Sequence, residues 1–215
     1  MATTGMTIPR RAGSRRALGA ALVAALLAGP VTACMLEGDD VTLQRVAVGY
    51  AYPEALYVLG AVSSARLGGK LDWTLGIDAT ASPEQLRLVM LRINSALFKL
   101  RGRLASATPS VSAPALSIVL LEPMLWTRFA TENGKLGMEV HRQGPANGDV
   151  VLVTEEPVIA AIVNGTLSFG EARSLGLVRL YGRGQDVATA RAWLEADDSP
   201  ARIAHHAVDD ERRAR

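Results

Sequence analysis

The residues that could carry catalysis in this chain are few and scattered. Histidine occurs three times, at His141, His205 and His206, and a hydrolase would need one of them as a base beside a nucleophile and an orienting acid. His205 and His206 stand in a polar C-terminal tail, and His141 falls at an outward position of an expected strand. Two adjacent histidines can bind a metal ion, but no further histidine or cysteine lies near them in the sequence. The pattern favours a solvated tail over a metal site.

Adjacent carboxylates offer a second kind of chemistry, because general acid–base catalysis often uses two carboxyl groups. Glu155 and Glu156 are adjacent at the end of an expected strand, directly before Pro157. Acidic side chains at such a place favour the positive N-terminus of the following helix, which is the interpretation we prefer. The sequence has no G-x-S-x-G, H-E-x-x-H, phosphate-binding or dinucleotide-binding glycine motif. We therefore expect no enzymatic activity and no cofactor.

The first 33 residues form the clearest signal in the chain. They hold four arginines and no acidic residue, followed by an apolar run over residues 17–29 and then small residues. This is the order of a secretory signal peptide, and the run is too short for a membrane-spanning helix. Val31-Thr32-Ala33-Cys34 resembles the lipobox of bacterial lipoproteins, in which the cysteine is lipidated and becomes the mature N-terminus. The alternatives are a simple secretory signal with a free cysteine, or an uncleaved anchor.

Cys34 is the single cysteine, so that no intramolecular disulfide and no cysteine-based metal cluster can form. The resemblance to a lipobox implies a lipid-anchored protein of the bacterial cell envelope that faces the periplasm and reaches the membrane through its N-terminal lipid. Without the leader, 19 basic residues stand against 21 acidic ones. A mature chain of this charge has no nucleic-acid footprint.

Residues 41–104 have a helical composition, and residues 34–40 before them fit a tether. Pro53 should split the first part into two helices, the second of which runs from Glu54 and ends at Gly68-Gly69. Tyrosines cluster around this break, either to pack against the next helix or to line a ligand mouth or membrane interface. We favour packing.

A long helix should start at Ser82, because Ser82, Pro83 and Gln85 form a capping box with proline in the first turn. Its apolar seam has alternating spacings of four and three residues. Further apolar residues widen that seam enough to suit burial in a core, although a basic amphipathic helix can also lie on an anionic membrane. The seam comprises Leu86, Met90, Ile93, Leu97, Leu100 and Leu104, and the further residues are Leu88, Leu91 and Phe98.

Residues 105–114 are small, polar and proline-bearing, and we interpret them as a linker between the helical region and a second part. Strands follow over residues 116–121 and 124–130, and Asn133-Gly134 predicts a hairpin before another strand. Residues 197–215 mix charges with few large apolar side chains and fit a disordered tail.

Residues 149–182 carry the most informative pattern for the fold. They predict a buried strand, a short helix ending at Asn164-Gly165, a second helix capped by Ser168 and Glu171, and a closing strand after Gly176. The pattern resembles the C-terminal half of sterol-carrier-protein-like domains, on Gly165, Leu167, Ser168, Ala172, Gly176 and Gly182. The resemblance implies an α+β domain over residues 115–196, with a mixed sheet of about four strands covered on one face by helices.

The resemblance also implies a ligand, because that family shelters apolar molecules between sheet and helices. Our first hypothesis is a non-catalytic lipoprotein that binds a lipid or a similar apolar ligand; the alternative is a membrane-anchored structural module that binds an envelope protein and no ligand. The same residues could line a pocket or fill a solid core. The candidate lining comprises Trp126, Phe129, Met138, Ile159, Ile162, Val163 and Leu167.

Overall fold

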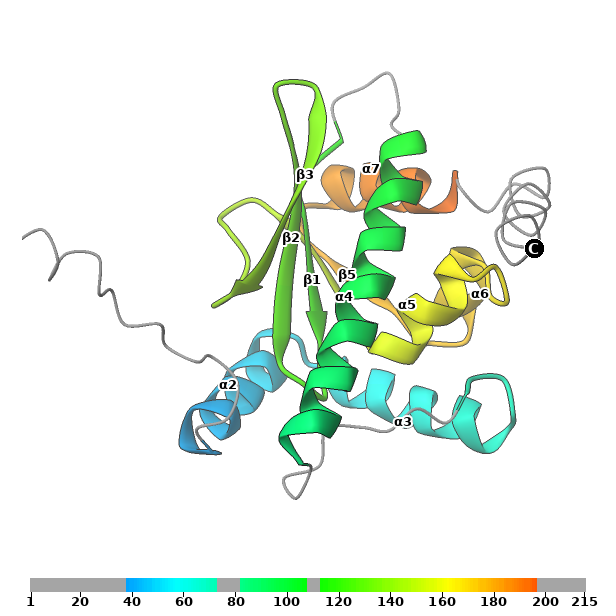
Figure 1. The fold of residues 1–215 in the computed structure, drawn as a ribbon. Coiled ribbons are helices and arrows are strands. Elements are labelled where there is room, and N and C mark those ends of the chain that lie inside the picture. Colours follow the sequence, from blue (N-terminus) through cyan, green and yellow to red (C-terminus); the bar gives the residue numbers. More distant parts are fainter. Residues whose placement is uncertain (1–37, 73–81, 108–112, 197–215) are drawn as a thin grey trace, which may run out of the picture. The chain divides into compact units, whose positions relative to one another are not determined.

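The computed structural model describes residues 38–72, 82–107 and 113–196, all of which belong to one compact unit, Met35–Arg215. The expected signal peptide, Cys34 and the C-terminal tail lie outside the described residues. Within those ranges the chain forms six helices and five strands (Figure 1). The helices are α2 (Gly38–Ala51), α3 (Ala55–Leu67), α4 (Pro83–Ser106), α5 (Glu156–Val163), α6 (Phe169–Ser174) and α7 (Gly184–Glu195). The strands are β1 (Leu116–Leu120), β2 (Leu125–Glu132), β3 (Lys135–Arg142), β4 (Val150–Thr154) and β5 (Arg179–Tyr181).

The strands form a single mixed sheet in the order β3-β2-β1-β4-β5. β1 and β4 are parallel, whereas the other neighbouring pairs are antiparallel. Asn133 and Gly134 both have positive φ in the β2–β3 turn, as the Asn-Gly hairpin predicts. The α+β class with a mixed sheet is confirmed, with five strands rather than about four.

Local capping signals produced the helix boundaries that they predict. Ser82 and Gln85 form both hydrogen bonds of a capping box at the start of α4, and Ser168 and Glu171 do the same at α6. Pro53 separates α2 from α3, because proline cannot continue the hydrogen-bond ladder of a helix.

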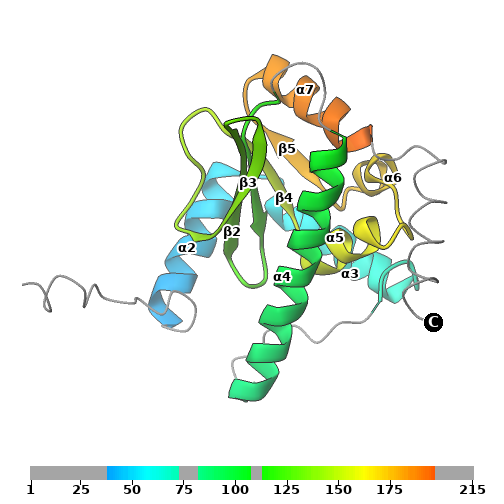
Figure 2. The ribbon, with the colours of Figure 1, turned by 45° about the horizontal axis from the view of Figure 1, so that its top comes forward.

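Helices lie on both faces of the sheet (Figures 1 and 2). Helices α4 to α7 cover the face that carries Leu152, which shares an apolar interior with side chains of all four. On the other face, Tyr52 at the α2–α3 corner packs against Trp126 and Tyr181, with ring centroids 6.2 and 4.9 Å apart. Every residue of β1 and β4 is buried, which follows when both faces of the central strands are covered.

The division into a helical part and a separate α+β part at residues 105–114 is not what the structure shows. The described helices before this segment bury side chains in the same core as the strands after it, including Val58 of α3 and Leu97 of α4. Residues 108–112 lie outside the described part of the chain. Tertiary packing therefore joins the segments that the linker-like composition separates.

Helix α4 buries one face and leaves apolar side chains on the other. Of the predicted seam, Ile93, Leu97, Leu100 and Leu104 are buried. Leu86 and Met90 are half-buried. Leu88, Leu91 and Phe98, which we expected to widen the buried face, are exposed instead. They lie on the side of the helix that faces away from the sheet, where no described element covers them.

No helix in the described ranges combines the length and the hydrophobicity needed to cross a membrane.

Candidate functional site

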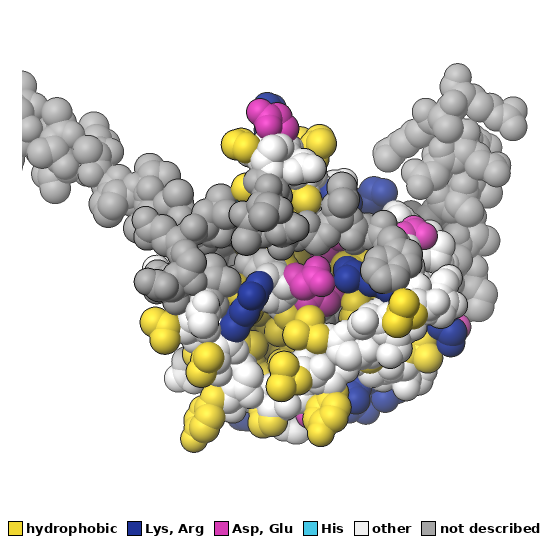
Figure 3. All heavy atoms as spheres, turned by 90° about the horizontal axis from the view of Figure 1, so that it is seen from below, with side chains coloured by type: hydrophobic (Ala, Val, Ile, Leu, Met, Phe, Trp, Pro, Cys, Tyr) yellow, Lys and Arg dark blue, Asp and Glu magenta, His cyan; other side chains and the backbone are white. Residues whose placement is uncertain are grey.

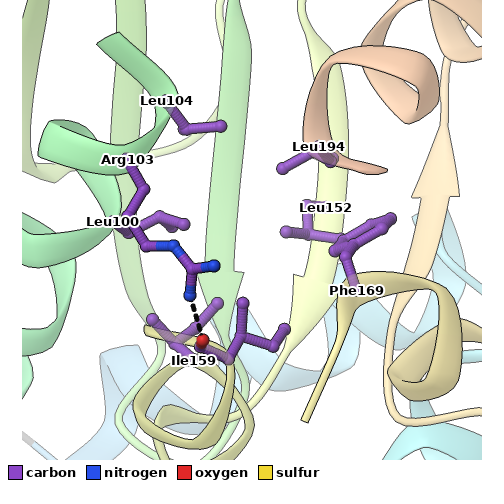
Figure 4. Close-up of a pocket in the computed structure, with 8 residues that line it drawn as sticks. Leu100, Arg103, Leu104, Leu152, Ile159, Phe169 and Leu194 are labelled. Atoms are coloured by element: carbon purple, nitrogen blue, oxygen red, sulfur yellow. Dashed lines mark hydrogen bonds between the residues drawn. The ribbon is translucent and has the colours of Figure 1, made fainter. Parts of the chain in front are cut away.

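The space between the sheet and helices α4 to α7, where we expected a ligand, is almost completely filled. A cavity of about 10 Å³ remains there, which is about the room needed for one water molecule. Figure 4 shows Arg103 reaching from α4 into this space, where it donates a hydrogen bond to the backbone oxygen of Ile162. The lining residues are Leu100, Arg103, Leu104, Leu152, Ile159, Ile162, Phe169 and Leu194. This interior is a packed core rather than a lipid site.

The seven side chains predicted to line a pocket do not surround one cavity. Ile159 and Ile162 contribute to the small interior cavity. Phe129 is fully buried and pairs across the strands with the half-buried Met138. Trp126 lies three residues from Phe129 on the same strand, so that it points to the opposite face, where it meets Tyr52.

The two remaining predicted residues lie at the end of α5 and just after it. Val163 is half-buried and Leu167 is buried in the core. Neither lines the small cavity between sheet and helices. All seven side chains belong to the hydrophobic core or pack against it.

A larger pocket lies between α2, α3 and the turn that joins β1 to β2. Its volume is about 350 Å³, within the range of about 300–1,000 Å³ that is typical of small-molecule sites. Figure 3 views this face of the molecule: acidic side chains occupy the centre of a hollow, basic ones flank them and apolar ones lie beside it. The pocket is lined by Arg45, Val48, Gly49, Ala55, Leu56, Leu59, Leu121, Glu122 and Met124.

Local sequence features shape this pocket. The break at Pro53 separates α2 from α3, and residues of both helices line the pocket. On the opposite wall, the turn after β1 contains Pro123, and Met124 takes a left-handed conformation with φ of 50°. Non-glycine residues rarely adopt that conformation, and such strain is concentrated at functional sites. The turn is held by hydrogen bonds from Leu121 to Thr154 (3.1 Å) and from Met124 to Leu121 (3.4 Å).

Charged groups gather at one end of the pocket. Arg45 donates a hydrogen bond to the backbone oxygen of Glu122 (2.8 Å), and the Glu122 carboxylate pairs with Arg66 (3.3 Å). The backbone N–H of Glu122 donates to Oε1 of Glu155 (2.8 Å). Glu122 follows β1 and Glu155 follows β4. Because these strands are parallel neighbours, their carboxyl ends meet at one edge of the sheet, where open sheets bind ligands.

Glu155 is the most perturbed titratable group among the described residues. Its residue is 1% exposed, and its Oε2 has no hydrogen-bond partner in the described structure. Burial, and next the nearby charge of Glu122, raise the pKa of Glu155 to about 8. The carboxyl group is therefore mostly protonated at physiological pH.

Glu155 and Glu156 do not face each other as a catalytic pair. Glu156 opens α5 and pairs with Arg92 (3.0 Å), whereas Glu155 contacts Glu122. His141 is exposed at the end of β3, and His205 and His206 lie outside the described residues. Within the described ranges, no group of three or more histidine, cysteine or acidic residues is placed to hold a metal ion.

The sequence contained one signal for this pocket. The tyrosines around Pro53 mark the α2–α3 corner, and a ligand mouth was one of the roles considered for them. Tyr52 packs against Trp126 and Tyr181 of the sheet rather than against the next helix, while Tyr50 and Tyr57 are exposed. The apolar residues of α2, α3 and the β1–β2 turn had no common pattern along the chain that would group them.

No protein-family model and no curated protein matches the sequence. Among solved structures, the chain is similar to sterol carrier protein 2-like 2 from Aedes aegypti, with 17% identity, a TM-score of 0.37 and coverage of 48% of this chain and 96% of that chain.

A second similarity is to the stereoselective inverting sec-alkylsulfatase Pisa1 from Pseudomonas sp., with 20% identity, a TM-score of 0.32 and coverage of 44% of this chain and 14% of that chain. A double mutant of the sec-alkyl sulfatase has 23% identity and the same TM-score of 0.32, over 38% of this chain and 13% of that chain. None of these similarities assigns the chain to a family.

Proposed function

We propose that this chain is a lipid-anchored protein of the bacterial cell envelope that binds an amphiphilic lipid, without catalysis, in the pocket between α2 and α3. The observation that carries the proposal is the 350 Å³ pocket itself. Its wall is apolar along most of its length, and charged groups stand at one end. Pockets with this composition bind apolar bodies and orient them through a few polar contacts.

The charges at the polar end favour an anionic head group. Glu122 and Arg66 offset each other in an ion pair. Glu155 carries no charge at neutral pH, because burial and then the charge of Glu122 raise its pKa to about 8. The polar end therefore carries one net positive charge, that of Arg45. Its guanidinium has five N–H donors, one of which is bonded to the backbone oxygen of Glu122. A carboxylate or a phosphate fits this end, and an alkyl chain fits the wall formed by Val48 and Leu59.

The anchor in the proposal rests on the lipobox-like segment at Cys34. Intact-mass measurement of the protein purified from membranes tests it. A mature chain that begins at Cys34 and carries the added mass of a diacylglyceryl group and a fatty acyl chain supports the anchor. A chain with a free thiol at this position, or one that retains residues 1–33, excludes it.

Ligand binding is tested on the mature chain with Cys34→Ser, so that no attached lipid competes. We expect a fluorescent fatty acid to bind and Gly49→Leu to abolish binding, because the new side chain would occupy the pocket. A Cβ at Gly49 meets nothing within 4 Å, and leucine favours a helix over glycine by about 1 kcal/mol. The variant should therefore fold at least as well as the parent.

Gly60→Leu is the matched control. A Cβ at Gly60 of α3 likewise meets nothing within 4 Å, but Gly60 does not line the pocket. It should gain similar helix stability and keep ligand binding. Arg45→Met should weaken the binding of the fatty acid more than the binding of an uncharged fatty alcohol of equal length. A parent protein that takes up neither probe would contradict the proposed function.

The stripe on α4 favours a second candidate, a module that binds an envelope protein. Leu88, Leu91 and Phe98 follow one another at helical spacing and are all exposed. If the chain migrates in native membrane extracts as a complex of defined mass, and if a Leu88→Gln, Leu91→Gln, Phe98→Gln variant migrates alone, this candidate gains support. An empty lipid extract from the same complex would separate it from the first.

A further inference from the structure

The outer surfaces of α2 and α3 carry large apolar side chains that the fold does not bury. On α2, Leu43, Val46 and Tyr50 are 67%, 66% and 91% exposed. Their spacing of three and four residues places them in one stripe along the helix. On α3, Leu56 and Tyr57 are each 73% exposed. We call these five side chains the outer apolar face.

The core does not account for these side chains. Helix α3 buries a different set of residues, among them Val58 and Val62, and α2 buries Val48. A surface helix of a solvated domain normally places polar residues opposite its buried side. A large exposed apolar patch on a folded domain marks a surface that contacts a membrane or another molecule.

The position of the start of α2 favours a membrane as the surface that these side chains contact. Helix α2 begins at Gly38, four residues after Cys34, and four residues span at most about 14 Å. A lipid on Cys34 would therefore hold the first turn of α2 within that distance of the bilayer surface. Tyrosine, with an apolar ring and a polar hydroxyl, is enriched at the membrane–water interface.

We propose that the outer apolar face of α2 and α3 docks on the lipid bilayer beside the anchored N-terminus, and that the α2–α3 pocket opens toward the membrane. Leu56 links the two features, because it lines the pocket and is largely exposed. Figure 3 shows apolar side chains around the hollow on this face. An amphiphile can then pass from the bilayer into the pocket without crossing water. The inference rests on the proposed function for the anchor and for the use of the pocket.

Vesicle flotation tests the docking on the mature chain with Cys34→Ser, which has no acyl chain of its own. We expect this protein to bind vesicles of phosphatidylethanolamine and phosphatidylglycerol. Substitution of Leu43, Val46 and Tyr50 by glutamine should weaken binding at least about tenfold, because three apolar side chains no longer leave water. These side chains are exposed, so that thermal unfolding should remain unchanged.

The α4 stripe supplies a control with the same number of apolar-to-glutamine substitutions. Leu88→Gln, Leu91→Gln and Phe98→Gln together remove a similar amount of exposed apolar surface from a helix outside the outer apolar face, and this variant should bind vesicles like the parent. Equal losses in both variants would show nonspecific adhesion and overturn the proposal. So would an α2 variant that binds like the parent.

A tryptophan probe measures the geometry directly. Tyr50→Trp should add emission that brominated phospholipids quench, whereas Phe98→Trp should add emission that they do not, with the three native tryptophans giving the shared background. Unquenched emission at position 50 would overturn the docking.

Two further measurements address the alternatives. One asks whether a second copy of the chain covers the outer apolar face, and the other asks whether the proposed function fails while the docking holds. If the α2 substitutions lower the mass in analytical ultracentrifugation and leave vesicle binding intact, a second copy covers the face and the proposal is wrong. Fatty-acid binding without vesicles, compared between the parent and Gly49→Leu, reports on the pocket alone. A chain that docks but binds no fatty acid refutes the function and leaves the docking standing.

Discussion

Replacement of Glu155 by glutamine should remove a large pH dependence of stability. The Glu155 residue is 1% exposed at the end of β4. It accepts a hydrogen bond from the backbone N–H of Glu122 (2.8 Å). Burial, followed by the charge of Glu122, raises its pKa in the folded protein to about 8, from an ordinary value of 4.5.

The sign follows from proton linkage. Between pH 4.5 and about 8, folded Glu155 holds a proton that the unfolded chain has released. The free energy of unfolding therefore falls as pH rises through this interval, by about 1.4 kcal/mol per pH unit. The stabilisation is fully present below the unfolded pKa and is lost above the folded one, a difference of about 5 kcal/mol over the whole interval.

Urea denaturation of the mature Cys34→Ser chain between about pH 5.5 and 8.5 measures this slope. We expect the parent to lose about 3 kcal/mol over that range and Glu155→Gln to lose less than about 1 kcal/mol. The amide is neutral at every pH, and its oxygen can accept the same hydrogen bond from Glu122. Above about pH 8 the variant should be the more stable protein.

Glu132→Gln, at the exposed end of β2, should keep the slope of the parent. If the parent is equally stable at pH 5.5 and 8.5, or if the glutamine variant at position 155 keeps the slope, the reasoning about the buried carboxyl group is refuted.

Three further substitutions test the packing of the domain by chemical denaturation. Burial raises the pKa of Asp149, but hydrogen bonds led by that of Ser117 (2.6 Å) outweigh it and hold the pKa below its ordinary value of 3.8. Asp149→Asn should therefore lower the free energy of unfolding by about 2–3 kcal/mol at neutral pH. The stability difference between parent and variant should shrink as pH falls below 3.8, and a difference that stays the same at acid pH would contradict this. Trp193→Phe removes the buried hydrogen bond to the backbone oxygen of Leu104 (3.1 Å) and should destabilise by about 1–3 kcal/mol; a neutral effect would mean that this bond does not hold α7 to α4. Ser168→Ala removes the N-cap of α6 and should cost about 1 kcal/mol, which Ser168→Asp should largely restore.

The elements that were predicted correctly depend on neighbours in the chain. The capping boxes at Ser82 and Ser168 join residues three apart, and Asn133-Gly134 needs only its own two conformations to close a hairpin. Such interactions form within a few residues and can be recognised in the sequence. The predicted role of Cys34 is of the same local kind and remains a prediction.

The errors concern contacts between distant segments. Phe129 and Trp126 were both candidate lining residues, yet the alternation of side chains along a strand places them on opposite faces of the sheet. Whether a pocket lies on either face depends on where the helices pack. Leu88 and Leu91 match a core-facing helix, but nothing in the spacing shows that the sheet would cover only one side of α4.

The sequence by itself determined most of the helices and strands and the α+β class, because each of these is encoded by periodicity or by short motifs, and its leader at the N-terminus remains a prediction of the same kind. Only the tertiary structure decided that the expected interior is filled, that a pocket opens between α2 and α3, and that Glu155 is neutral. The charged end of that pocket joins Arg66 to Glu122, 56 residues apart, and Glu122 to Glu155, 33 residues apart. A pKa or a pocket depends on which distant groups exclude water together, and that is a property of the packed chain.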